Sequence, residues 1–131
     1  NNMKNKEIWS VDCMIDVFEC DGDSFDQIKI KKFAQAISKI IDPGREILGI
    51  VNPFGEHEDR MKGIRLIHEN ENSLITGHFV DKDFKFFINV MSCAPYKVSE
   101  VINVIKKTFK TENYLCRRAL REYGVGDGKT A

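Results

Sequence analysis

The chain has 131 residues, 42% of them hydrophobic and 31% charged, a composition typical of one soluble globular domain. Lys and Arg together number 20, as do Asp and Glu, so the formal net charge is zero, which argues against nucleic acid or an anionic membrane as the main partner. No apolar run approaches the roughly 20 residues of a membrane span. We therefore expect a cytoplasmic protein of one domain, residues 1–131, with flexible ends at 1–7 and 121–131 and a small molecule or another protein chain as partner.

The first half of the chain is predicted to form a strand, a helix and a second strand. Residues 9–17 alternate between apolar and mainly polar side chains, the period of a half-buried strand. Ser24 stands three residues before Gln27, which indicates a capping box. The helical stripe that follows is formed by Ile28, Phe33, Ile37, Ile40 and Ile41. The helix is expected to end near residues 42–44, before a short strand at 46–51 and a long polar loop at 52–62.

The second half is predicted to begin with three strands, at residues 63–69, 73–80 and 84–93. The two short connections between them, 70–72 and 81–83, favour an antiparallel meander. After Pro95, a second amphipathic helix is indicated by Val98, Val101, Ile102, Ile105 and Phe109. Residues 114–120 are expected to form an edge strand or a partly ordered tail, and residues 124–131 to fray.

This order of elements predicts an α+β fold, a two-layer sandwich in which two helices cover one face of a mainly antiparallel sheet. Residues 84, 86, 88 and 90 form one apolar row of their strand, while Phe87 and Met91 lie on the opposite face with Cys93. If the helices cover the first row, the second row is left for a ligand or a second protomer.

The most informative segments of the sequence are 72–79 and 86–93. Ser73 opens a strand, His78 follows five residues later and Cys93 twenty residues later. This pattern resembles the self-processing and catalytic signature of the prokaryotic S-adenosylmethionine decarboxylases. The end of the first strand, residues 16–21 (DVFECD), also resembles that family, and the likeness covers about residues 9–109.

The resemblance implies an enzyme that makes its own cofactor from Ser73. The Ser73 hydroxyl attacks the carbonyl of Asn72, an ester forms, and elimination cuts the chain between these two residues, leaving a covalent pyruvoyl group on the new N-terminus. The pyruvoyl ketone accepts the electrons released with CO₂ from the substrate, as pyridoxal phosphate does. By the same resemblance, Cys93 donates a proton to the product carbanion and His78 assists ester formation and elimination.

Strand geometry separates two of these residues. Five residues of extended chain span about 16 Å, and an odd offset places Ser73 and His78 on opposite faces unless a bulge intervenes. A two-fold homodimer with shared active sites, as the family is understood to form, would bring His78 of one protomer to Ser73 of the other.

Three further residues are candidates for binding the substrate. Phe54, in the long loop, resembles by position the aromatic residue that stacks on adenine in the family. Glu19 and Glu71 are candidates to face a cationic substrate such as a sulfonium or a diamine. Asn72 stands where the family has Glu, and the 52–62 loop has no counterpart of the family's second processing Ser.

The leading interpretation is an S-adenosylmethionine decarboxylase of spermidine biosynthesis. A decarboxylase of a free basic amino acid such as ornithine or arginine remains open, because the chemistry needs only an α-amine and an α-carboxylate. Two interpretations without catalysis also remain open. One is a homologue that is not processed and binds a metabolite, and the other is an α+β interaction module whose motif match is accidental. Cys13, Cys20, Cys93 and Cys116 include no CxxC pair, and no metal site is predicted.

Overall fold

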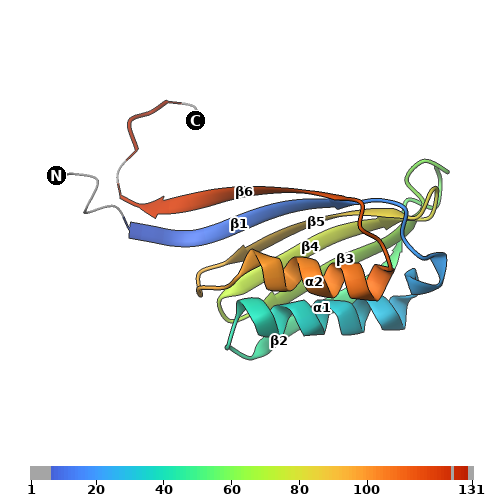
Figure 1. The fold of residues 1–131 in the computed structure, drawn as a ribbon, viewed down its shortest axis with the longest axis horizontal. Helices are drawn as coiled ribbons and strands as arrows, with labels where there is room; N and C mark the ends of the chain where they lie inside the picture. The colour runs from blue at the N-terminus through green and yellow to red at the C-terminus, as the bar shows by residue number, and fades with distance from the viewer. Residues whose placement is uncertain (1–6, 125, 130–131) are drawn as a thin grey trace.

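The computed structural model describes residues 7–124 and 126–129 of the chain (Figure 1). Within this part, the elements in order are β1 (Glu7–Val17), a 3₁₀ helix (Gly22–Ser24), α1 (Gln27–Ile41), β2 (Glu46–Phe54), β3 (Gly63–Asn70), β4 (Ser73–Val80), β5 (Lys85–Ser92), α2 (Val98–Phe109) and β6 (Tyr114–Tyr123). The strands form one antiparallel sheet in the order β2-β3-β4-β5-β1-β6. Both α-helices lie on the same face of it (Figure 1), so the predicted α+β sandwich is confirmed.

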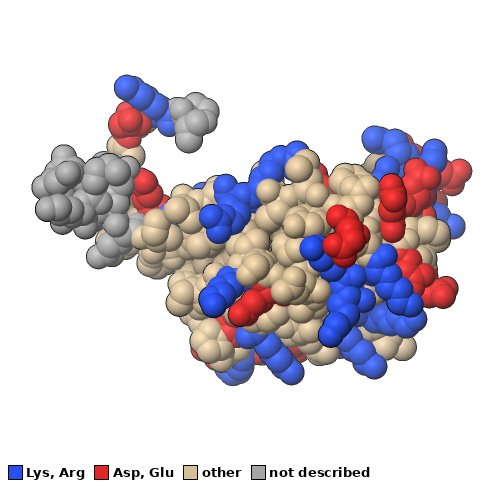
Figure 2. All heavy atoms as spheres, in the orientation of Figure 1, with Lys and Arg blue, Asp and Glu red and all other residues tan. Residues whose placement is uncertain are grey.

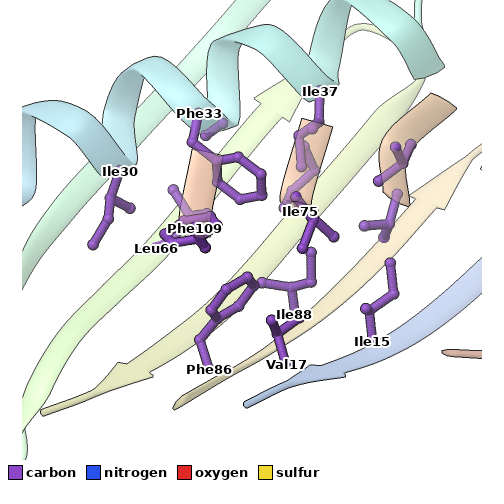
Figure 3. Close-up of a cluster of buried hydrophobic side chains, with 14 of the residues drawn as sticks. Ile15, Val17, Ile30, Phe33, Ile37, Leu66, Ile75, Phe86, Ile88 and Phe109 are labelled. Carbon is purple, nitrogen blue, oxygen red and sulfur yellow. The ribbon is translucent and has the colours of Figure 1, made fainter. Parts of the chain in front are cut away.

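The core lies between the helices and the sheet face that they cover. Side chains of α1, such as Phe33 and Ile37, point toward the sheet and meet apolar side chains of β4 and β5 (Figure 3). The ring centroids of Phe33 and Phe109 are 4.9 Å apart, and the ring planes meet edge to face at 81°, a favourable aromatic geometry. This packing fixes which residues of each strand are buried and which point to the other face.

The alternation predicted for residues 84–93 is confirmed along β5. Phe86, Ile88 and Val90 are buried under the helices, whereas Phe87 and Met91 are exposed on the other face. Phe84 is the exception to the apolar row, because it belongs to the turn before β5 and is 41% exposed.

The predicted start of the first helix is wrong. Ser24 belongs to the 3₁₀ helix, and its Oγ donates to the carbonyl of Thr108 (3.0 Å) instead of capping α1. Asp26 is the N-cap, since its Oδ1 accepts from the N–H of Ile28 (2.8 Å). This start also turns Ile28 outward, where it is 67% exposed. The buried face of α1 consists of Ile30, Phe33, Ala34, Ile37, Ser38 and Ile41.

Several strand limits extend past the predicted ones. Residues 52–54, predicted as loop, continue β2 because they pair with residues 63–65 of β3. At the chain ends, Glu7 pairs with Tyr123, so residue 7 and residues 121–123 lie in strands and not in flexible ends. Residues 1–6, 125 and 130–131 lie outside the described part of the chain.

The surface carries both signs of charge. Figure 2 shows Lys and Arg side chains intermixed with Asp and Glu on the face in view, in agreement with the balanced composition. Neither α-helix of the described residues has the length and apolar character needed to cross a membrane.

Candidate functional site

Ser73 is the first residue of β4 and follows a two-residue turn from β3. It pairs with Asn70 of β3 and with Ser92 of β5, in the middle of the sheet. The residue is only 7% exposed, and its Oγ makes no well-formed hydrogen bond with the described residues, although it lies close enough to Asp42 to lower the pKa of that carboxyl. A buried hydroxyl without a partner is uncommon in folded proteins. The Ser73 hydroxyl therefore contributes little hydrogen bonding to the stability of the fold.

The peptide bond before Ser73 is fixed on its carbonyl side. The N–H of Cys93 donates to the carbonyl oxygen of Asn72, with 2.9 Å between the two atoms. Such a hydrogen bond polarises the carbonyl and stabilises negative charge that develops on its oxygen. The carbonyl oxygen of the bond that the sequence predicts to be cut is therefore hydrogen-bonded in the uncut chain.

Asp42, which follows α1, holds Asn72 from the other side. Its Oδ2 accepts from the backbone N–H of Asn72 (2.7 Å), and its Oδ1 accepts from Asn72 Nδ2 (3.0 Å) and from the N–H of Gly44 (2.7 Å). Burial raises the pKa of Asp42, whereas hydrogen bonds from Asn72 and Gly44 and the neighbouring Ser73 hydroxyl lower it, and the net pKa is below the ordinary 3.8. Asp42 is therefore a buried carboxylate beside the predicted cleavage site.

Cys93 directly follows β5, and its side chain is exposed. Ser92, its neighbour, anchors this strand end, because its buried Oγ donates to the carbonyl of Ile41 (2.6 Å) and accepts from the N–H of Ala94 (3.1 Å). Ser73 and Cys93 line one surface pocket of about 530 Å³. The other residues that line it are Trp9, Glu69, Asn70, Glu71, Asn72, Leu74 and Met91.

His78 lies at the other end of β4 and on the opposite face from Ser73. Ser73 is buried under the helices, whereas His78 is exposed on the face that the helices leave open, where its strand neighbours are Arg65 and Phe87. β4 pairs continuously with both neighbouring strands from Ser73 to Val80. The prediction that the two residues do not meet within one chain is therefore confirmed.

Phe54 lies beside His78, far from Ser73 along β4. The two rings stack with 4.1 Å between centroids and 11° between planes, and the guanidinium of Arg65 lies 5.4 Å from the centre of the Phe54 ring. Burial and, second, the charge of Arg65 lower the pKa of His78 below its ordinary 6.5. The lowered pKa therefore favours the neutral imidazole, the form that accepts a proton.

The two glutamates proposed as substrate ligands differ in position. Glu71 lines the Ser73 pocket, and its Oε1 accepts from the backbone N–H of Arg45 and pairs with its guanidinium, both at 3.2 Å. Glu19 follows the end of β1, and its Oε1 accepts from Asn113 Nδ2 (3.2 Å). Because the end of β1 pairs with the start of β5, Glu19 lies at the same end of the sheet as His78.

The open face between these two ends is partly apolar. Leu74, Phe87 and Met91 are each about 40% exposed on it, and Met14 is 51% exposed. A second pocket of about 470 Å³ lies over β1, β4, β5 and β6 and includes Asp12 and Arg121, which form an ion pair of 2.9 Å. Among the described residues, no group of three His, Cys, Asp or Glu side chains is placed to bind a metal ion.

The structure thus brings Asn72, Ser73, Cys93 and Glu71 together and places His78, Phe54 and Glu19 at the other end of the sheet. Sequence analysis did not single out Trp9, which lines the pocket, or Asp42 and Ser92, which lie beside it. The sequence places Asp42 only at the end of a helix, and its contact with Asn72 joins positions 30 residues apart. A single sequence carries no local signal for such a contact.

Comparison with protein-family models and with curated proteins finds no match. Comparison with solved structures finds an adenosylmethionine decarboxylase from Aquifex aeolicus vf5, with a TM-score of 0.71 over 95% of this chain and 98% of the other. The two chains share one fold. Their sequences are 14% identical, so the likeness supports the fold expected from the Ser73, His78 and Cys93 pattern.

Proposed function

We propose that this chain is the proenzyme of a pyruvoyl-dependent decarboxylase of the S-adenosylmethionine decarboxylase type, which cleaves itself between Asn72 and Ser73. The observation that carries the proposal is the buried Ser73 Oγ, which makes no well-formed hydrogen bond with the described residues and adjoins a carbonyl that accepts from Cys93. A hydroxyl free of competing hydrogen bonds beside a polarised carbonyl suits an N→O acyl shift. The residues around position 73 therefore fit the formation of a pyruvoyl group there.

A pyruvoyl group at position 73 supplies an electron-withdrawing carbonyl for the decarboxylation of an α-amino acid. The chain's own residues bind and orient the substrate and move protons. Cys93 delivers the proton to the α-carbon once CO₂ has left, because its exposed side chain and Ser73 line the same pocket.

The enzyme is a homodimer whose open sheet faces meet. His78 and Phe54 lie at the far end of the open face from the Ser73 pocket, so one chain alone lacks His78 at the cleavage site. A two-fold axis across this face would place the partner's His78 end over the open side of the Ser73 pocket, whereas the Ser73 side chain itself lies on the helix side of the sheet. The exposed Leu74, Phe87 and Met91 between the two ends give the contact its apolar area.

S-adenosylmethionine is the proposed substrate, and its decarboxylated product donates aminopropyl groups in spermidine synthesis. A free basic amino acid such as ornithine or arginine is the second candidate. The Ser73 pocket suits a cationic substrate of either kind, because it is lined by two carboxylates, Glu69 and Glu71, together with the indole of Trp9. A homologue that is not processed and binds a metabolite in this pocket is the non-catalytic candidate, because Asn72 replaces the Glu of the family.

The experiment that tests self-cleavage is the intact mass of freshly purified protein under denaturing conditions. Cleavage replaces the 15.1 kDa chain by two fragments, residues 1–72 and 73–131, and the second resists Edman degradation because its N-terminus carries a ketone in place of an amine. The Ser73→Ala variant is the matched control and stays at 15.1 kDa. A wild-type chain that stays whole during long incubation contradicts the proposed enzyme and favours the metabolite-binding homologue.

The substrate is identified by release of labelled CO₂ from carboxyl-labelled S-adenosylmethionine, ornithine and arginine. Turnover of S-adenosylmethionine alone supports the leading candidate. Turnover of ornithine or arginine that excess S-adenosylmethionine does not inhibit supports the second.

A further inference from the structure

Asp42 is a buried carboxylate at an unfavourable place in the fold. Its side chain is 2% exposed, at the C-terminal end of α1, where the dipole of the helix disfavours an anion. A buried carboxylate at such a place destabilises the protein unless hydrogen bonds compensate it. The structure gives Asp42 three N–H donors, and two of them belong to Asn72.

The two contacts to Asn72 fix its orientation. Asp42 Oδ2 accepts from the backbone N–H and Oδ1 from the side-chain amide, while the carbonyl accepts from the N–H of Cys93. Asn72 is thus held at its amide, its side chain and its carbonyl. With those groups fixed, rotation about the bonds that carry the Asn72 carbonyl is strongly restricted, and the carbonyl keeps one face toward the next residue.

We propose that Asp42 is a positioning residue for self-cleavage, holding Asn72 so that its carbonyl carbon faces Ser73 Oγ. This inference rests on the proposed function. In the first step, Ser73 Oγ bonds to the carbonyl carbon of Asn72, the bond from that carbon to Ser73 N breaks, and the hydroxyl proton passes to that nitrogen.

In the second step, the ester loses the α-proton of residue 73 and the Asn72 carboxylate leaves. The resulting enamine at residue 73 takes up water and releases ammonia, so atoms balance without an oxidant or reductant. The hydrogen bonds from Asp42 to Asn72 lie on the acyl side of the bond, so we expect Asp42 to act before the ester forms.

A purely structural role predicts a different result. In that case Asp42 only tethers the 43–45 turn through Gly44, and its loss lowers stability without changing the cleavage rate of the folded protein. The two roles are separated by the rate of the acyl shift, which hydroxylamine reports because it cleaves the ester and releases residues 1–72 as the hydroxamate.

The test compares wild type with Asp42→Asn and Asp42→Glu by intact mass over time, with and without hydroxylamine. The Asp42→Asn chain keeps the size of the side chain but replaces one carboxylate oxygen by an NH₂ group, so it no longer accepts from both donors of Asn72, and we expect both spontaneous and hydroxylamine-released cleavage to slow by at least about tenfold. Asp42→Glu restores a carboxylate, and we expect it to recover a rate within about threefold of wild type.

Ser38→Ala is the matched control, because Ser38 is also buried on α1 but its Oγ bonds to the carbonyl of Gln35 within the helix. We expect it to cleave at the wild-type rate. Circular dichroism and thermal unfolding establish that each variant is folded. If Asp42→Asn does not fold, Asn72→Ala replaces it, since it removes only the side-chain contact and is expected to slow cleavage about threefold.

The outcomes separate this inference from the proposed function. A folded Asp42→Asn chain that cleaves within twofold of wild type overturns the role of Asp42 and leaves the pyruvoyl enzyme intact. The role of Asp42 is also overturned if spontaneous cleavage of Asp42→Asn is slow but its hydroxylamine-released rate equals that of wild type. A wild-type chain that cleaves under neither condition overturns both.

Discussion

Replacing Ser92 by Ala tests the junction that carries the candidate site. Ser92 Oγ is fully buried and donates to the carbonyl of Ile41, the last residue of α1. The last four carbonyls of a helix have no partner within it, so Ser92 supplies the hydrogen bond that Ile41 otherwise lacks. Loss of the hydroxyl leaves a buried carbonyl without that bond, which costs about 1–3 kcal/mol of unfolding free energy.

The expected loss for Ser92→Ala is about 2 kcal/mol, near the middle of that range. Ser38→Ala is the control, because the Gln35 carbonyl that accepts from Ser38 lies inside α1 and also accepts the helical N–H four residues on. Its hydroxyl is therefore a second donor, and its loss should cost less than about 1 kcal/mol.

The assay is urea unfolding followed by circular dichroism, with both substitutions made in the Ser73→Ala chain so that every sample is one uncut polypeptide. A loss of about 2 kcal/mol lowers the midpoint by roughly 1 M urea at the slopes typical of small domains. The reasoning is refuted if Ser92→Ala and Ser38→Ala shift the midpoint equally. A reduced slope would instead indicate that the denatured or native state has changed.

Four further outcomes are expected. Arg65→Gln removes a nearby positive charge and raises the pKa of His78 toward 6.5, which NMR titration of the ring protons measures; an unchanged pKa contradicts the charge effect. Because the pKa of Asp42 is lowered on folding, its contribution to stability is present above pH 3.8 and is lost as the pH falls further. Asp42→Asn should therefore weaken the fall in unfolding free energy at acid pH, as measured by urea titrations at a series of pH values. An equally steep fall in the variant would contradict this. Gly63→Ala places a methyl group on a backbone carbonyl of β4 and should lower stability by several kcal/mol or prevent folding, whereas a normal unfolding midpoint would show that β3 can shift. Met91→Asp puts a charge on the open sheet face and should convert the proposed dimer to a monomer in analytical ultracentrifugation. A wild-type protein that is already a monomer would contradict the proposal that two chains share each active site.

The strands and the relative faces of their residues were predictable because period-two alternation is a local property. The range 73–80 matches β4, and the separation of Ser73 from His78 follows from counting along it. The helix start was not predictable in the same way, since both Ser24 and Asp26 are good caps and only the contact of Ser24 with Thr108 decides between them.

The part of the candidate site that lies in neighbouring strands, or that a family resemblance indicated, was predictable from the sequence. Ser73 and Cys93 meet because β4 and β5 are neighbours in an antiparallel meander, which short connections already favour. The position of Asp42 beside Asn72 was not predictable, because this contact depends on where the end of α1 lies over the β3–β4 turn. Phe54 was predicted in a loop, but strand pairing places it beside His78.

The strand order has a consequence for a chain cut at the β3–β4 turn. The N-terminal piece would contribute β1, β2 and β3, and the C-terminal piece β4, β5 and β6, yet β1 lies between β5 and β6 while β3 pairs with β4. Strands of the two pieces therefore alternate in one sheet, and each piece also supplies one of the two α-helices (Figure 1). Separating them would break three strand pairings at once, so the nicked protein is expected to stay assembled in the absence of any covalent link.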